Sequence, residues 1–271
     1  MSHPWFSSYP DQVPHEIDIN EYKSVVDVFE QSFSKFKNNP SFTCMGKTYT
    51  YGELDNLSKK FASYLQNDLK LSKGSRVALM MPNILQYPIA LFGILRAGLI
   101  AVNVNPLYTE RELEHQLNDA GVDAIVIFAN SAHILQKVLP KTKVKHVMVT
   151  QIGDLLSFPK SLLVNFVIKN VKKMVPAWDI PSHINFNDTL AIGDESKFKK
   201  QDVGHDDIAF LQYTGGTTGV AKGAVLTHKN IIANMLQARS WIGSGIEPGK
   251  EIIITPLPLY HIFSLTANCL V

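Results

Sequence analysis

The sequence lacks several features that would set it apart from ordinary globular proteins. It has only two cysteines, Cys44 and Cys269, whose wide separation argues against a disulfide framework or a zinc site and favours a reducing, cytoplasmic compartment. No apolar run reaches the roughly 18 residues that a membrane-spanning helix needs. The first residues also lack the basic segment and apolar run of a secretory signal. The formal net charge is only +2, so we expect no nucleic-acid partner.

What is present is typical of a folded domain. Hydrophobic residues make up 45% of the 271 residues, and charged residues 18%. The 16 glycines and 14 prolines are too few for a low-complexity or collagen-like chain. This length can bury a large core in one large domain or two modest ones.

Short apolar runs alternate with helical patterns from about residue 40 onward. The runs at 76–81, 99–104, 124–128 and 146–150 predict buried strands. Capping boxes at Thr50–Glu53 and Thr109–Glu112 predict two helix starts. Near-continuous apolar strands separated by helices are typical of a parallel sheet that is covered on both faces. We therefore predict an α/β fold with mostly parallel sheets flanked by helices.

The pattern changes between about residues 151 and 205, which hold several prolines and no strong strand. We interpret this as a division between residues 1–175, a first α/β lobe with an N-terminal arm, and residues 176–271, the start of a second lobe. Apolar runs at 207–212 and 252–255 predict strands of that second lobe. The chain stops in an apolar stretch at Val271 without a helix stop signal, which predicts a truncated chain.

One glycine-rich segment directly follows the predicted strand 207–212. Its glycines would let backbone N–H groups converge, and its threonines and lysine add donors and positive charge, which together suit a phosphate. Unlike a P-loop, it leads into a predicted strand at 223–227, and a helix follows only at His228. We therefore predict a loop within a hairpin, with a turn that binds nothing as the alternative. The candidate residues are Tyr213, Thr214, Gly215, Gly216, Thr217, Thr218, Gly219, Val220, Ala221, Lys222, Gly223 and Ala224.

This segment resembles the phosphate-binding loop of the adenylate-forming enzymes, which include the acyl-CoA synthetases. The stretches 48–54 and 95–98 resemble two further motifs of that superfamily. Within it, the stretches 80–88, 103–108 and 256–263 are most similar to bacterial long-chain fatty-acid–CoA ligases. The family loop often has Ser at the position of Gly216 and Pro at that of Ala221, so Thr214, Thr217 and Thr218 would supply the hydroxyl groups here.

The resemblance implies an N-terminal fragment of a ligase that activates a long-chain fatty acid with ATP and Mg²⁺ and transfers the acyl group to coenzyme A. It implies that Lys222 and His261 are catalytic residues, with His261 near the acyl carboxylate. The Mg²⁺ ligands, the adenine site and a mobile C-terminal lid domain would lie beyond Val271. No metal ligand is therefore assigned, and we expect the fragment alone to have little or no activity. The alternatives are an aryl- or amino-acid-activating enzyme and a non-catalytic nucleotide-binding or assembly module.

Three further features each allow two interpretations. His261 follows the predicted strand 252–255, where sheet edges often carry sites, but a buried structural histidine is the alternative. His228, at a helix start, suits a structural or capping role. Residues 161–175 predict an amphipathic helix, with Val164, Val167, Ile168, Val171, Met174 and Val175 opposite Asn165, Lys169, Lys172 and Lys173. This helix would either contact the inner face of the membrane or pack on its own domain, and a homodimer also stays open.

Overall fold

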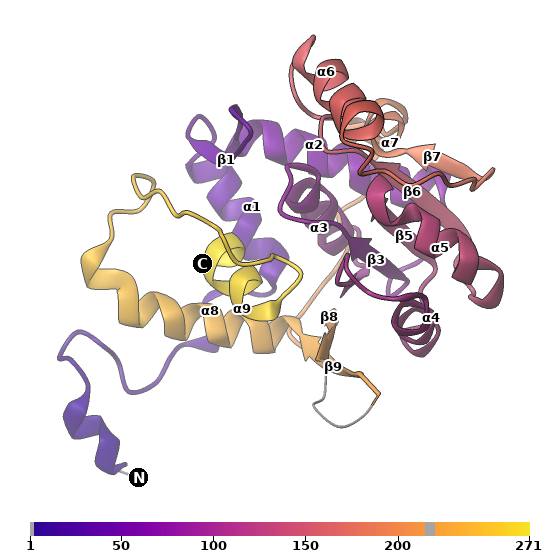
Figure 1. Cartoon of the computed structure of the whole chain (residues 1–271). Coiled ribbons are helices and arrows are strands. Elements are labelled where there is room, and N and C mark those ends of the chain that lie inside the picture. The colour runs from indigo at the N-terminus through magenta and orange to yellow at the C-terminus, as the bar shows by residue number, and fades with distance from the viewer. Residues whose placement is uncertain (1–2, 215–219) are drawn as a thin grey trace.

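The computed structural model describes residues 3–214 and 220–271, and Figure 1 shows the course of the chain. The strands are β1 (Pro40–Cys44), β2 (Lys47–Thr50), β3 (Arg76–Met80), β4 (Ile100–Asn103), β5 (Ala124–Phe128), β6 (His146–Thr150), β7 (His183–Asn185), β8 (Ile208–Thr214) and β9 (Lys222–Thr227). The α-helices are α1 (Val25–Lys35), α2 (Tyr51–Ser63), α3 (Gln86–Arg96), α4 (Glu110–Asp119), α5 (Ala132–Val138), α6 (Lys160–Phe166), α7 (Phe186–Ile192), α8 (His228–Ile242) and α9 (Ile262–Ser264).

Shorter helical turns connect or extend these elements. They are η1 (Pro4–Ser8), η2 (Ile19–Glu21), η3 (Tyr64–Asp68), η4 (Ala129–Ser131), η5 (Leu139–Lys141), η6 (Val167–Val171), η7 (Glu195–Lys197), η8 (Gly243–Gly245) and η9 (Leu265–Leu270). Within the described ranges, no helix is both long and apolar enough to cross a membrane.

A seven-stranded sheet runs through the molecule in the order β7-β6-β5-β3-β4-β8-β9. Its neighbouring strands are parallel from β7 to β8, and β9 alone pairs antiparallel, with β8. The strands β1 and β2 form a separate antiparallel pair. The predicted α/β fold with a mostly parallel sheet flanked by helices is confirmed.

Alternate residues of the central strands face two separate apolar layers. Val77 and Leu79 of β3 pack into the core that includes α1, α2, α3 and α8, whereas Ala78 and Met80 pack into the core that includes α4 and α5. This alternation follows from the two-residue period of a strand, and it explains why strands covered on both faces are apolar throughout. Figure 1 shows the helices on either side of the strands.

The helix starts follow the local sequence closely. Thr50 and Thr109 each accept a hydrogen bond from the backbone N–H three residues later, and the Glu at that position bonds back to the threonine N–H. Both predicted capping boxes are therefore confirmed. Thr227 and Asn230 form a third box at the start of α8. Each cap contributes about 1 kcal/mol because it satisfies N–H groups that have no partner within the helix.

One expectation about the second half is wrong. Residues 252–255 form no strand, because no strand among the described residues pairs with them. The stretch 151–205 contains the short strand β7, whose three residues His183–Asn185 are too few and too polar to predict. The sheet also continues across residue 175, since β7, β8 and β9 pair with the strands of residues 1–175. The division into lobes 1–175 and 176–271 stays a prediction.

Candidate active site

The candidate loop joins the last two strands of the sheet. Thr214 at the end of β8 pairs with Lys222 at the start of β9, so the described part of the segment is a β-hairpin, as predicted. The residues Gly215, Gly216, Thr217, Thr218 and Gly219 lie outside the described residues. Because β8 runs parallel to β4, the hairpin begins at the carboxyl edge of the parallel strands, where open α/β sheets bind ligands.

The described residues that flank the loop offer donors to solvent. Thr214, Val220 and Lys222 are exposed, and Ala221 is half-buried. Within the described ranges, the Lys222 ammonium forms no ion pair, so its charge is not neutralised by a protein carboxylate. A lysine at a sheet edge in this state can bind an anion such as a phosphate.

Both arms of the hairpin are fastened to α4. The Tyr213 hydroxyl donates to Asp119 Oδ2 at 2.5 Å, and His115 Nε2 lies 2.9 Å from the carbonyl oxygen of Ala221. Burial and the Asp119 carboxylate raise the pKa of Tyr213 well above its ordinary value, so this hydroxyl stays a donor. A Cβ on Gly223 would lie 2.9 Å from the Tyr213 ring, so this position needs glycine. Sequence reasoning found Tyr213 and Gly223 but missed Asp119 and His115.

His261 lies in a segment that returns to the same edge of the sheet. Its side chain is exposed among the residues that the structure describes. Its Nδ1 accepts a hydrogen bond from the backbone N–H of Phe263 at 3.3 Å, so His261 is the N-cap of α9. Gln212 of β8, two residues before Thr214, donates from Nε2 to the carbonyl oxygen of Tyr260 at 3.0 Å. The structure therefore connects the segment that carries His261 to the strand that carries the loop.

His228 contrasts with His261. It is buried, and its Nδ1 accepts a hydrogen bond from the backbone N–H of Val25 at 3.2 Å, which ties α8 to α1. Burial lowers the pKa of His228 to about 4, so the ring is neutral at physiological pH. The structural role predicted for this residue is confirmed, although Thr227 is the residue that caps the helix.

Four polar residues beside the site were not found from the sequence. Asn83 follows β3, Tyr87 lies in α3, Asn103 ends β4 and Gln212 lies in β8, and their side chains reach the segment before His261 or one another. The available signal was the position of polar residues at or near the ends of apolar strands. Such positions line the edge of a parallel sheet where ligands bind.

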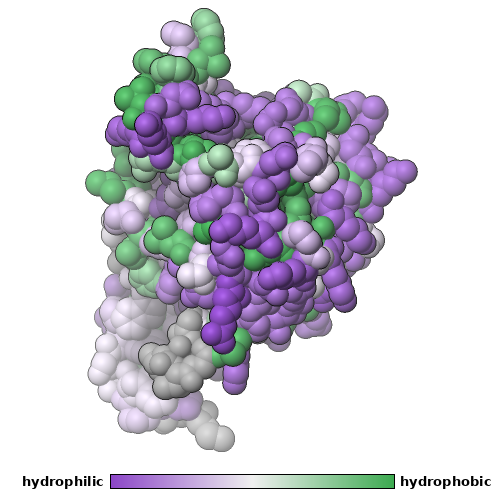
Figure 2. Space-filling view, turned by 45° about the vertical axis from the view of Figure 1, so that its right-hand side comes forward, coloured by the Kyte–Doolittle hydropathy of each residue, from purple (hydrophilic) through white to green (hydrophobic). Residues whose placement is uncertain are grey.

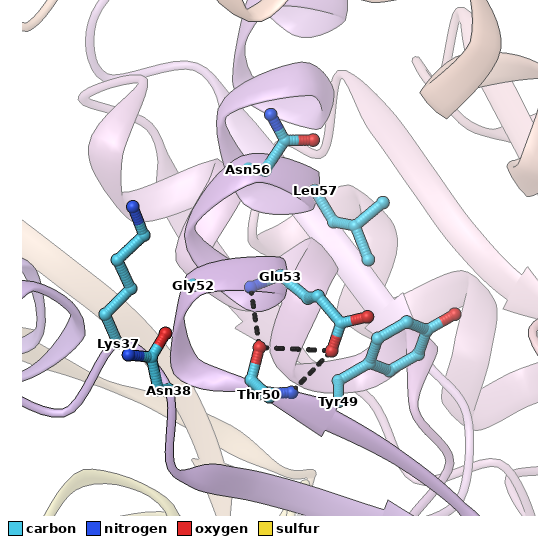
Figure 3. Close-up of a pocket in the computed structure, with 8 residues that line it drawn as sticks. All are labelled: Lys37, Asn38, Tyr49, Thr50, Gly52, Glu53, Asn56 and Leu57. Atoms are coloured by element: carbon cyan, nitrogen blue, oxygen red, sulfur yellow. Dashed lines mark hydrogen bonds between the residues drawn. The ribbon is translucent and has the colours of Figure 1, made fainter.

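Neither a metal site nor the hollow in Figure 3 adds to this arrangement. Among the described residues, no group of three or more His, Cys, Asp or Glu side chains could hold a metal ion. A hollow of about 430 Å³ lies at the start of α2. Figure 3 shows the residues that line it, Lys37, Asn38, Tyr49, Thr50, Gly52, Glu53, Asn56 and Leu57. Its Thr50 and Glu53 side chains are already used by the capping box.

Comparison with known proteins assigns this chain to a family. Residues 29–271 match the AMP-binding enzymes. The chain belongs to the AMP-binding enzyme family. Over its whole length it is 56% identical to a long-chain-fatty-acid–CoA ligase of Escherichia coli O157:H7 and 52% identical to one of Haemophilus influenzae, covering 48% of each. It therefore spans about half the length of these relatives.

A solved structure supports the same family assignment. The crystal structure of a long-chain-fatty-acid-CoA ligase from Archaeoglobus fulgidus superposes with a TM-score of 0.72 at 25% sequence identity. The match covers 95% of this chain and 46% of that one. The fold expected from the resemblance is thus confirmed for the described part of the chain.

Proposed function

We propose that this chain is the phosphate-binding and carboxylate-positioning part of a long-chain fatty acid–CoA ligase. The observation that carries the proposal is that β8 leads into the Thr214–Lys222 loop while its Gln212 holds the segment that ends in His261. Relatives at 52–56% identity over the whole chain, named long-chain-fatty-acid–CoA ligases, support the choice of substrate.

The proposed reaction has two steps. The fatty-acid carboxylate attacks the α-phosphorus of ATP, and the bond to pyrophosphate breaks to leave an acyl-adenylate. The thiolate of coenzyme A then attacks the acyl carbon, and AMP leaves. In the first step two anions approach each other, so positive charge and N–H donors around the phosphates lower the barrier. A bound Mg²⁺ would neutralise further phosphate charge.

Different residues of this chain would bind the phosphates and orient the fatty-acid carboxylate. Lys222, with its unpaired charge, would bind a phosphate oxygen, and the hydroxyl of Thr214 would donate to another. The same task is proposed for the loop residues Gly215, Gly216, Thr217, Thr218 and Gly219, and for the flanking Tyr213, Val220, Ala221, Gly223 and Ala224. The exposed His261 would orient the fatty-acid carboxylate by donating from Nε2, because its Nδ1 already accepts from the backbone N–H of Phe263.

The test uses protein expressed from the complete reading frame. Pyrophosphate release is followed with ATP, coenzyme A and palmitate, and in parallel with benzoate and a set of amino acids. We expect turnover with palmitate and a fall of about 10²-fold or more in kcat/KM for Lys222→Ala. Lys229→Ala, an exposed lysine of α8, is the matched control and should retain activity. Turnover with aryl or amino acids alone would contradict the proposed substrate. ATP binding without any turnover would indicate a non-catalytic module.

We further propose that α6 and η6 contact the membrane, with a correction to the face involved. Of the face expected from the sequence, Val164, Val167, Ile168 and Val175 are half-buried, whereas Val171 and Met174 are exposed. The exposed apolar side chains of this stretch are Phe158, Leu162, Leu163, Phe166, Val171 and Met174, of which only Val171 and Met174 belong to the expected face. Figure 2 shows hydrophobic residues gathered on the projection at the top of the molecule, where α6 lies in Figure 1.

The charges next to this face favour an anionic bilayer. Lys169, Lys172 and Lys173 are exposed and none of them forms an ion pair within the described ranges. Apolar side chains flanked by lysines are typical of segments that lie in the headgroup region of a membrane. The proposal implies a cytoplasmic protein that binds peripherally to the inner face of the membrane. It would bring the enzyme to a substrate that partitions into lipid.

Vesicle flotation tests the membrane contact. Wild-type protein should float with vesicles that contain phosphatidylglycerol. The triple variants Leu162→Ser, Leu163→Ser, Phe166→Ser and Lys169→Glu, Lys172→Glu, Lys173→Glu should float much less. The control is Ile252→Ser with Ile254→Ser, which removes apolar side chains elsewhere that are even more exposed. Equal flotation of all variants would contradict the contact. A homodimer also stays a prediction, which light scattering on the same protein would check.

A further inference from the structure

Residues 257–260, just before His261, are held by side chains rather than by a regular strand. Asn83 Nδ2 donates to the carbonyl oxygens of Thr255 at 3.1 Å and Leu257 at 2.8 Å. Asn83 Oδ1 also accepts from the backbone N–H of Leu259 at 2.8 Å. One amide side chain thus satisfies three backbone groups of this segment.

The next two peptide groups are held by buried residues from other elements. The Tyr87 hydroxyl lies 2.9 Å from the carbonyl oxygen of Leu259, and Gln212 Nε2 donates to that of Tyr260 at 3.0 Å. The carbonyl of Tyr260 belongs to the peptide group that leads directly into His261. Every peptide group from Leu257 to His261 therefore contacts a side chain from α3, β8 or the end of β3.

Asn103 links these side chains into one network. It ends β4 and pairs in register with Gln212 of β8. Its Oδ1 lies 2.8 Å from the Tyr87 hydroxyl, and its Nδ2 donates to Gln212 Oε1 at 3.1 Å. Gln116 of α4 donates to the backbone carbonyl of Asn103 at 2.8 Å. All four side chains are buried, and burial raises the pKa of Tyr87 well above its ordinary value, so its hydroxyl keeps its proton.

A buried polar network of this kind costs free energy of folding that apolar packing would not cost. Buried amide groups must satisfy their donors and acceptors internally, and apolar residues would pack the same space without that constraint. Here Nδ2 of Asn103 donates to Oε1 of Gln212, and this hydrogen bond fixes the orientation of the Gln212 amide. The Nε2 of Gln212 therefore faces the carbonyl oxygen of Tyr260. The network therefore specifies one position for the backbone before His261.

We propose that Gln212, Asn103 and Tyr87 are positioning residues that act on the reaction through His261. The inference rests on the proposed function, in which His261 orients the fatty-acid carboxylate. A displacement of about 1 Å in such a group can lower the rate by about 10²-fold, so loss of the network should reduce fatty-acid activation without any loss of a group that touches the substrate.

The experiment is a double-mutant cycle in protein expressed from the complete reading frame. Gln212→Met keeps the side-chain length and removes the donor to Tyr260. It should lower kcat/KM for palmitate by about tenfold or more in the wild-type background and have no further effect in His261→Ala. Tyr87→Phe, which removes only a hydroxyl, should behave in the same way. Gln86→Met is the matched control, because this buried glutamine also makes two hydrogen bonds, to Thr150 and to the carbonyl oxygen of Gln151, but none to the network or to residues 255–261.

Hydrogen exchange on the same proteins reports the geometry separately. Gln212→Met should raise the exchange rate of the amides in residues 256–262 and leave those of β5 unchanged. Equal further losses in the His261→Ala background, or an activity loss without a change in exchange, would overturn the proposal. A silent His261→Ala variant would also overturn it. Absence of palmitate activation by the wild type would instead refute the proposed function, and the exchange data would still show whether the network holds the segment.

Discussion

Two isoleucine-containing apolar runs of this chain adopt different structures: one forms a buried strand and the other does not. β5, Ala124–Phe128, is buried along its whole length between β3 and β6. Residues 252–255 have three consecutive isoleucines, yet Ile252 and Ile254 are 92% and 85% exposed and no strand forms. The difference lies in their neighbours. A strand is stable when its N–H and C=O groups pair and its side chains pack, and β5 has a partner on each side and a helical layer on each face.

The largest effect should come from truncation inside β5. Ile125 is fully buried, so Ile125→Ala removes packed methyl groups and leaves a cavity. We expect a loss of about 2–5 kcal/mol in the free energy of unfolding, measured by urea denaturation. A loss below about 1 kcal/mol would mean that the two apolar runs differ less than their exposure indicates.

The next largest effect concerns pH and the docking of α8, which leads from the hairpin toward residues 252–255. The folded-state pKa of His228 is about 4, below the 6.5 of an unperturbed histidine. The folded state therefore binds fewer protons between these values. Stability from a neutral His228 is complete above about pH 6.5 and is lost as the pH falls toward 4, by up to about 3 kcal/mol.

Unfolding by urea at a series of pH values between 4 and 7 measures this loss. His228→Asn should remove most of the pH dependence in that window. Thr227→Ala is the matched control, because it weakens the same helix start without changing a titratable group. If His228→Asn and wild type lose stability in parallel as the pH falls, burial of this histidine does not account for the slope.

A smaller effect should come from Asn83, which holds residues 255–259 in place of a neighbouring strand. Asn83→Ala removes three hydrogen bonds and should cost about 1–2 kcal/mol of stability. It should also raise amide exchange in residues 252–261 but not in β5. Asn118→Ala, which loses two bonds to backbone carbonyls elsewhere, is the control. Unchanged exchange near residue 259 would show that Asn83 does not anchor the segment.

The smallest effect is expected at the exposed isoleucines themselves. Ile254→Ala should change the free energy of unfolding by no more than about 0.5 kcal/mol, since the side chain buries little surface. The substitution is chemically the same as Ile125→Ala, and both are measured in the same protein. A cost similar to that of Ile125→Ala would show that Ile254 is covered in solution, for example by another copy or another part of the protein.

Local sequence signals predicted much of the fold because they act over a few residues. The capping boxes at Thr50 and Thr109 need only a side chain and a backbone group three residues apart, and both form. The hairpin around the candidate loop followed from an apolar strand on each side, and β8 and β9 pair as expected. The order of glycines, threonines and lysine in the loop, together with the stretches 48–54 and 95–98, indicated the family.

The expectations that needed correction depended on residues distant in sequence. In the amphipathic pattern of 161–175, Val164, Val167 and Ile168 of the predicted apolar face are half-buried, whereas Leu162, Leu163 and Phe166 outside that face are exposed. The helix is also not uniform, because α6 gives way to the wider turn η6 at Val167. Periodicity shows that two faces differ, and only the surroundings decide which one is covered.

The sequence by itself determined the buried strands, the helix caps and the glycine-rich loop with its lysine, because each depends on residues close together in the chain. Tertiary structure alone decided which apolar run becomes a strand and which polar residues meet at the sheet edge. Asn83, Tyr87, Asn103 and Gln212 come from four separate elements and converge before His261. Such contacts arise when parallel strands place their ends side by side, and no local pattern encodes that arrangement.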